Sequence, residues 1–270
     1  MHALTTIHPF GPVTVHSSTD RKPCSPTPQH PPPPRRSRVI DLSHTIAEGL
    51  VTYPGLPAPT ISSFLSRQDS ASRYAPGTEF TMDIITMIGN TGTYIDSPFH
   101  RYAGGTDLAG LDIETLVDLR AEVFHLSAAA ERGIGAEVFR DRDLAGAAVL
   151  LHTGWDRHFG EEEYGHAAPY LTEEGARFLV DAGAALVGID SVNIDDASSG
   201  GERPAHTLLL AAGIHIVEHL TGLDRLPARG ARFTAVPPKI EGFGTFPVRA
   251  FAVLPEAADE SRVQGVSPQG

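Results

Sequence analysis

The sequence predicts an α/β fold, and residues 147–219 carry most of the evidence for it. Two short, uninterrupted apolar runs, 147–151 and 184–189, are typical of strands covered on both faces of a sheet. Between these runs, Thr172 is a good N-cap for a helix that is expected to end near Gly183. Helices that alternate with buried strands in this way indicate an α/β sheet with flanking helices.

The chain before this stretch contains weaker signals. Residues 39–44 have the composition of a strand that runs into a polar turn, and segment 80–88, rich in Ile, Met and Thr, predicts a buried strand. Segment 56–77 shows little periodicity and is expected to be mostly loop. The apolar spacing further predicts a helix over 111–119, a strand over 121–126 and a short helix over 135–140.

The chain after this stretch has more regular signals. A short apolar helix over 205–212 is expected to stop at Gly213, since glycine commonly follows the last helical residue. Three strands are predicted after it, over 214–219, 233–236 and 246–253.

Both ends of the chain differ from its centre. Residues 1–38 include the proline run 31–34, and proline at this density removes backbone donors and favours polyproline II. We expect a disordered proline-rich extension over 1–38, a single catalytic domain over 39–254 and a flexible tail over 255–270.

Composition and charge limit the partners of the chain. Its 270 residues carry a formal net charge of −12, which repels nucleic acid and anionic membranes and leaves a small molecule as the expected partner. The lone Cys24 excludes a disulfide framework and a Cys-based zinc knuckle within the chain. The chain contains neither an apolar run of about 18 residues nor a secretory signal pattern, so we expect a soluble cytoplasmic protein.

Asp96 and His100 occur together in a glycine- and proline-containing turn, residues 89–100. Pro98 stiffens this turn and biases Ser97 toward extended geometry. A carboxylate and an imidazole on such a turn suit acid/base catalysis or metal ligation. The alternative is a turn whose aspartate only caps its own backbone.

Glu218 and His206 are two further candidates. A period of two puts Glu218 on the same strand face as Ile214 and Ile216, where its carboxylate needs a metal, a histidine or a substrate as partner. His206 opens the short helix before this strand, so we expect it near Glu218. In the alternative, Glu218 lies in water at the sheet rim or pairs with an arginine, and His206 is an ordinary helix residue.

Several short motifs follow one another in a specific order along residues 39–254. They are Val39 to His44, Tyr53 to Gly55, Gly92 to His100, Thr153 to Trp155, Gly188 to Ser191, His206 with Leu208 and Leu209, and Ile216 to Glu218. In this order they resemble the cyclase family, which includes kynurenine formamidase and isatin hydrolase. The resemblance implies a swivelling β/β/α fold with a mixed sheet, assembly as a homodimer or homotetramer, and hydrolysis of small amides or lactams with zinc or manganese.

The hallmark segment of that family is His-x-Gly-Thr-His-x-Asp-x-Pro-x-His. By resemblance, Asp96 matches the metal-bridging aspartate and His100 the nearby catalytic histidine. His206 and Glu218 match the ligands of a second metal ion.

This chain departs from the hallmark at two positions. Asn90 and Tyr94 stand where the family has its two metal-binding histidines, and neither is a good zinc ligand, so the primary metal site is expected to be lost. In one interpretation Asp96, His206 and Glu218 still hold one ion. In the other, which we favour from the residues, the site is metal-free. Its general base is then His100 or His206, partnered by Asp96 or Glu218, and Tyr94 or Asn90 donates to an oxyanion.

The sequence therefore predicts an enzyme that acts on a small carbonyl compound, with either no cofactor or one divalent ion, zinc or manganese. Amide hydrolysis is harder without a metal, so cyclisation, dehydration or isomerisation, as in metabolite tailoring, is the first expectation. One alternative is a metal-dependent amidohydrolase. The other is a relative that binds a small ligand without turnover.

Overall fold

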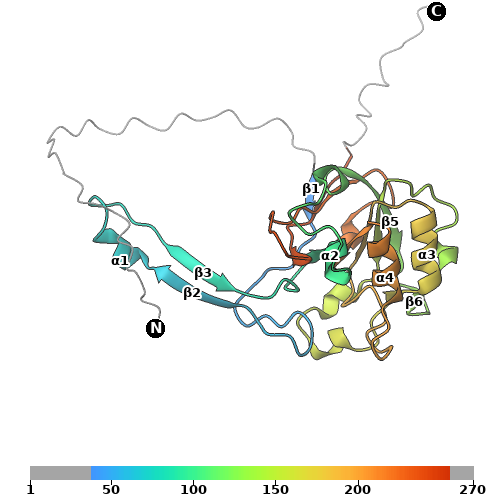
Figure 1. Ribbon diagram of the computed structural model, residues 1–270, viewed down its shortest axis with the longest axis horizontal. Helices are drawn as coiled ribbons and strands as arrows, with labels where there is room; N and C mark the ends of the chain where they lie inside the picture. The colour runs from blue at the N-terminus through green and yellow to red at the C-terminus, as the bar shows by residue number, and fades with distance from the viewer. Residues whose placement is uncertain (1–37, 256–270) are drawn as a thin grey trace, which may run out of the picture. The chain divides into compact units, whose positions relative to one another are not determined.

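The computed structural model describes residues 38–255 (Figure 1). The predictions for the proline-rich extension and for the C-terminal tail concern residues that lie, apart from Arg38 and Pro255, outside this described part. The single catalytic domain expected over 39–254 stays a prediction. Within residues 38–255, no helix has the length and apolar character needed to cross a membrane.

Four parallel strands form the centre of a nine-stranded sheet, which confirms the predicted α/β class. They lie side by side in the order β5 (Leu119–His125), β7 (Ala148–His152), β9 (Leu186–Ile189) and β10 (His215–Glu218). β7, β9 and β10 are fully buried, since largely apolar runs in a parallel sheet are covered on both faces, and in β10 His215 and Glu218 are buried as well.

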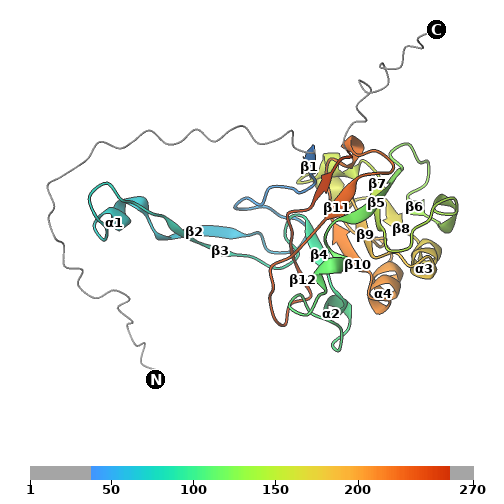
Figure 2. The ribbon, with the colours of Figure 1, turned by 90° about the horizontal axis from the view of Figure 1, so that it is seen from above.

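Antiparallel strands extend the sheet at both edges, so the sheet is mixed (Figure 2). Beyond β5 lie β11 (Arg232–Thr234), β13 (Phe251–Val253) and β1 (Val39–Asp41). Beyond β10 lie β4 (Tyr94–Asp96) and β12 (Thr245–Pro247). The single strand predicted over 246–253 is therefore wrong: the chain leaves one sheet edge after β12 and joins the other end of the sheet as β13, between β11 and the edge strand β1.

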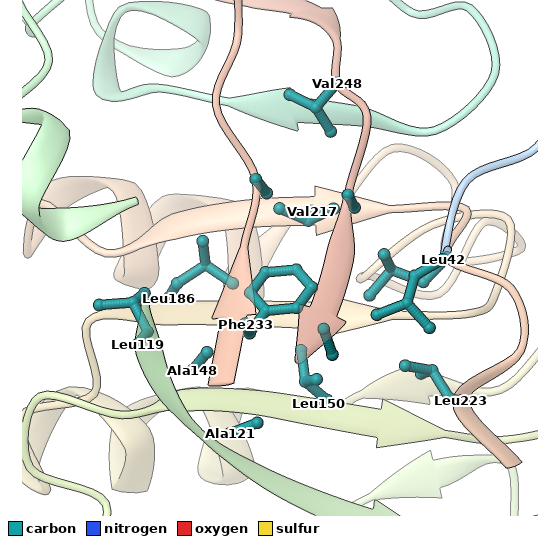
Figure 3. Packing of buried hydrophobic residues seen from close by; sticks show 14 of the residues in the cluster. Leu42, Leu119, Ala121, Ala148, Leu150, Leu186, Val217, Leu223, Phe233 and Val248 are labelled. Carbon is teal, nitrogen blue, oxygen red and sulfur yellow. The ribbon is translucent and has the colours of Figure 1, made fainter. Parts of the chain in front are cut away.

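The sheet separates two apolar cores. The first core brings residues of β11, β13 and β1 over the face of the central strands, and the ring of Phe233 lies in its middle (Figure 3). Its partners from the central strands include Leu150, Leu186 and Val217. The second core lies on the other face, under the helices.

Two helices cover that second face, α3 (Glu173–Asp181) and α4 (Pro204–Ala211). The Thr172 side chain accepts from the N–H of Gly175, which confirms the predicted N-cap. The predicted helix end at Gly213 is also confirmed, because this glycine has a φ of 75°. A shorter helix, α2 (Pro98–Arg101), follows β4 directly.

Two predictions for the first half of the chain are wrong. Segment 56–77 contains β2 (Thr60–Leu65) and α1 (Arg67–Ala71), and β2 pairs with β3 (Met82–Thr86) as a separate two-stranded sheet. All five residues of β3 are exposed, so it is not the buried strand that was expected before the central turn. The apolar residues of this segment therefore predict a strand correctly, but the expectation that the strand is buried is wrong.

The predicted helix over 111–119 is also wrong. Asp112 caps only a 3₁₀ turn, since its side chain accepts from the N–H of Glu114, and β5 starts at Leu119. A small parallel pair, β6 (Gly133–Ile134) with β8 (Tyr170–Leu171), completes the strands. The 3₁₀ turns are Ile113–Thr115, Ala136–Val138, Trp155–His158, Glu162–Gly165 and Leu223–Arg225.

Candidate active site

Strand pairing gathers the candidate site on one face of the sheet. β4 lies between β10 and β12, with Tyr94 opposite Glu218 and Asp96 opposite Thr245. Directly opposite residues of antiparallel strands point to the same face, with Cβ atoms about 5 Å apart. Ile95, the intervening residue, packs into the first core. Alternation along β4 therefore turns Tyr94 and Asp96 toward the face that α4 covers.

Thr245 connects Asp96 with His100. Its hydroxyl is hydrogen-bonded to Oδ1 of Asp96 and lies 2.6 Å from Nδ1 of His100. Because the carboxylate only accepts, the hydroxyl proton goes to Asp96 and the imidazole donates from Nδ1. Nε2 of neutral His100 then carries the free lone pair. Gly244 permits this approach, since a Cβ there would overlap the backbone of His100.

His206 enters the same site from the first turn of α4. The carboxylate of Asp195 accepts from the backbone N–H groups of Ala205 and His206, at 2.7 and 3.1 Å, and from Nδ1 of His206 at 2.6 Å. These bonds fix both the helix end and the imidazole orientation. Nε2 of His206 consequently lies 3.6 Å from Oδ2 of Asp96 and 3.7 Å from Oε1 of Glu218.

Glu218 is buried, and both of its oxygens accept hydrogen bonds. Oε1 accepts from the N–H of Ile194 at 2.6 Å, and Oε2 from the hydroxyl of Tyr94 at 2.7 Å. The Tyr94 hydroxyl also lies 3.2 Å from Nε2 of His219. Burial raises the pKa of Glu218 to about 7 and that of Tyr94 well above its ordinary value, so the phenol stays neutral.

The charges of Asp96 and His206 support one another. Burial by itself disfavours the His206 cation, but the carboxylates of Asp195 and Asp96 outweigh it and raise the pKa of His206 to about 10. Burial also opposes the Asp96 anion, yet the nearby His206 cation and the hydrogen bond from Thr245 hold the pKa of Asp96 below its ordinary value. With no ion bound, the site is thus a buried Asp–His ion pair.

A pocket of about 290 Å³ opens onto this group. It is near the lower end of the volumes that small-molecule sites occupy, about 300 Å³ upward. Five of the six site residues predicted from the sequence line it, and the sixth, Asp96, contacts two of them. The complete lining is Asn90, Tyr94, His100, Arg101, Asn193, Gly201, Arg203, His206, Thr207 and Glu218.

Sequence reasoning missed Asp195 and Thr245. Eight residues, 196–203, separate Asp195 from the helix whose first backbone N–H groups it accepts from, so no local pattern joins them. Thr245 comes close to Asp96 only because β12 pairs with β4. Neither position carries a signal in the linear sequence.

The donors around Asp96 suit a divalent metal ion. The ligand atoms of Asp96, His100 and His206 all lie within 4.8 Å of one another. Oδ2 of Asp96 is buried and has no hydrogen-bond partner within residues 38–255, so its charge needs a nearby cation, which either the protonated His206 ring at 3.6 Å or a metal ion in place of that proton supplies. Asp195 holds the His206 ring as a carboxylate commonly holds a metal-bound imidazole.

Comparison with known proteins identifies the family. A family model described as "Putative cyclase" matches residues 40–196. The chain belongs to the cyclase family. It is 32% identical over 213 residues to kynurenine formamidase of Geobacillus thermodenitrificans, covering 78% of this chain and 95% of that protein.

Solved structures agree with this membership. Isatin hydrolase A from Labrenzia aggregata superposes with a TM-score of 0.70 at 25% identity, over 80% of this chain and 93% of that one. A potential metal-dependent hydrolase with cyclase activity superposes with a TM-score of 0.66 at 26% identity, over 82% of this chain and 99% of that one. The predicted cyclase-family fold is confirmed, and the chain is an enzyme of a family whose relatives are hydrolases.

Proposed function

We propose that this cyclase-family enzyme hydrolyses an amide or lactam bond of a small carbonyl compound with the help of one divalent metal ion. The observation that carries the proposal is the unpartnered, buried Oδ2 of Asp96 facing Nε2 of His206. We assign Oδ2 of Asp96, Nε2 of His206 and Oε1 of Glu218 as the ligands, because the two oxygens lie 3.6 and 3.7 Å from the nitrogen.

Zinc or manganese bound there would polarise a carbonyl and lower the pKa of a water molecule. The residues of the chain supply the proton transfers and the orientation. His100 is hydrogen-bonded through Nδ1 to Thr245, so Nε2 is free to take a proton from water and return it to the leaving nitrogen. Asn90 lines the same pocket and carries an amide donor for an oxyanion, whereas the single hydroxyl proton of Tyr94 is donated to Glu218.

A second candidate function is metal-free acid/base chemistry, namely cyclisation, dehydration or isomerisation. The hydrogen bond from Tyr94 to Glu218 favours it, because it places a neutral phenol and a carboxyl group together on the pocket wall. Placed acids and bases suffice for such reactions.

Elemental analysis of the purified protein, with and without added zinc or manganese, tests the metal site. We expect close to one ion per chain, its loss in Glu218→Gln and Asp96→Asn, and its retention in His100→Ala. Loss in His100→Ala with retention in Glu218→Gln would instead assign the ion to Asp96, His100 and His206. No bound metal under any condition contradicts the proposal and leaves the acid/base candidate.

Hydrolysis assays on a simple amide and a simple lactam, formanilide and isatin, test the reaction. We expect metal-stimulated turnover that Asp96→Asn and His100→Ala abolish while the thermal unfolding curve stays that of a folded protein. Turnover that is unchanged in both variants would refute these roles. Binding of the compounds without any turnover would indicate that this protein binds a small ligand and does not catalyse its reaction.

We also propose that the chain assembles as a homo-oligomer through the β2–β3 hairpin. Its strands pair only with each other within residues 38–255, and they expose large apolar side chains, among them Ile61, Phe64, Met82, Ile84 and Ile85. A lone two-stranded sheet is marginally stable in water, and an apolar surface of this kind commonly marks an interface. A second copy is the partner, since most soluble oligomers consist of identical chains.

A further inference from the structure

Two arginines line the pocket beside the candidate metal ligands. Arg101 ends α2, directly after His100, and Arg203 immediately precedes α4, three residues before His206. They are the only lysine or arginine residues in the pocket lining, and Glu218 is the only acidic one. The pocket lining therefore carries two permanent positive charges in a chain whose net charge is −12.

Thr207 contacts the side chain of Arg101 and the backbone of Arg203. Its hydroxyl donates to the carbonyl of Arg203 at 2.6 Å and accepts from Nε of Arg101 at 3.4 Å. The Arg101 guanidinium also lies 5.3 Å from the ring centroid of Tyr102. These contacts hold the guanidinium through Nε and one face, and they leave its two terminal nitrogens for a ligand.

Arg203 is similarly held through one nitrogen. Its Nη1 donates to the carbonyl of Glu202 at 2.7 Å and lies 3.4 Å from Oγ of Ser199. Within the described part of the chain neither Arg101 nor Arg203 has an ion-pair partner, whereas Arg120, Arg132 and Arg142 are each paired with a carboxylate. Fixed guanidinium groups without a carboxylate of their own are what an anion site requires.

The remaining lining points to the same class of ligand. It contains no aliphatic side chain, and apart from the arginines, the histidines and Glu218 its members are Asn90, Tyr94, Asn193, Gly201 and Thr207. Such a pocket recognises a ligand by charge and hydrogen bonds rather than by burial of hydrocarbon.

We propose that Arg101 and Arg203 bind a carboxylate group of the substrate, at the end remote from the bond that reacts. This inference rests on the proposed function for the position of the reacting bond, and it adds the substrate class: a small carbonyl compound that carries a carboxylate. A planar carboxylate matches the two parallel donors that a guanidinium presents.

Direct binding of benzoate, measured by isothermal titration calorimetry on the purified full chain, tests this inference without turnover. Benzamide serves as the uncharged isostere and inorganic phosphate as the other oxyanion. We expect benzoate to bind and benzamide not to bind. The double variant Arg101→Gln/Arg203→Gln is expected to lower the affinity for benzoate by about tenfold or more, which is the effect of losing one charge-assisted hydrogen bond. Arg140→Gln, at an exposed arginine outside the pocket, should leave benzoate affinity unchanged.

Several outcomes would overturn the inference. Equal affinity for benzoate and benzamide would show that the negative charge of the ligand does not contribute to binding. Benzoate affinity that survives in the double variant but disappears after treatment with a chelator would place the anion on the metal ion instead. Preferential binding of phosphate would show that the two arginines recognise a phosphate group rather than a carboxylate. If benzoate binds through both arginines while no amide or lactam is hydrolysed, the anion site stands and the proposed reaction fails, so the two proposals are separable.

Discussion

The carboxylate of Asp195 lies 2.6 Å from Nδ1 of His206 and accepts its proton. The same carboxylate caps the N-terminus of α4, so one side chain sets both the position of the helix and the orientation of the imidazole. Nε2 is thereby fixed toward Asp96 and Glu218.

Asp195→Asn should lower metal affinity by about 10–100-fold, the usual effect of changing a group that orients a metal-bound histidine. The fold should survive, because the amide oxygen of asparagine can still accept from the backbone N–H of Ala205. Metal titration with competing chelators measures the change. Asp112→Asn, at a 3₁₀ turn away from the pocket, is the matched control. Equal metal affinity in Asp195→Asn and the control would show that the Asp195–His206 bond does not position a ligand.

Metal binding should strengthen as pH rises. The pKa of His206 is raised to about 10, so the ion-free protein carries a proton on Nε2 at neutral pH, and an ion must displace it. Affinity should therefore rise by about tenfold per pH unit between pH 7 and 9 if one proton is released. Calorimetry in buffers of different ionisation enthalpy counts that proton. Affinity that does not change with pH would contradict the protonated state of His206.

The same pKa shift predicts the stability of the ion-free protein. A histidine whose folded pKa exceeds its ordinary 6.5 stabilises the fold fully below that value, and the contribution is lost as pH rises through about 10. Urea unfolding of chelator-treated protein should accordingly give a lower free energy of unfolding at pH 10 than at pH 6 for the wild type. In His206→Asn the part of this difference that comes from His206 should disappear.

Thr245→Val should separate Asp96 from His100. The variant leaves Oδ1 of Asp96 without its hydroxyl donor, which costs about 1–3 kcal/mol of stability, and it frees the His100 ring to rotate. We expect a large loss of kcat with hydrolysis restored in Thr245→Ser. Thr234→Val in β11 is the control for a general loss of stability, because it removes a hydroxyl that accepts from the backbone N–H of Asp118. Full activity in Thr245→Val would exclude a role for this link.

The double variant Phe64→Ser/Ile84→Ser should reduce the oligomer to a smaller species. These side chains are 70% and 47% exposed on the hairpin, so their replacement removes apolar area from the proposed interface without touching either core. Light scattering coupled to gel filtration gives the mass. Ile113→Ser, 59% exposed outside the hairpin, should leave the mass unchanged. A monomeric wild type would end the proposal.

Much of the site was predictable because it sits on strongly patterned elements. The period of two in β10 separates Glu218 and Ile216 from Val217, and the structure places Ile216 and Val217 in different cores. His206 was expected near Glu218 because its helix immediately precedes that strand. The pairing of β2 with β3 was not predicted, since the residues of β2, Thr-Ile-Ser-Ser-Phe-Leu, do not alternate between polar and apolar, and five of the six are exposed.

The linear sequence by itself determined the alternation of helices and buried strands, the stiff turn that presents Asp96 and His100, and the ordered motifs of the cyclase family. These are properties of residues close together in the chain, where periodicity, caps and prolines act locally. Only the tertiary structure decided that Thr245 links Asp96 to His100, that Asp195 orients His206, and that two arginines meet at one pocket. Those relationships depend on strand order and on loop paths between distant segments, which no local pattern encodes.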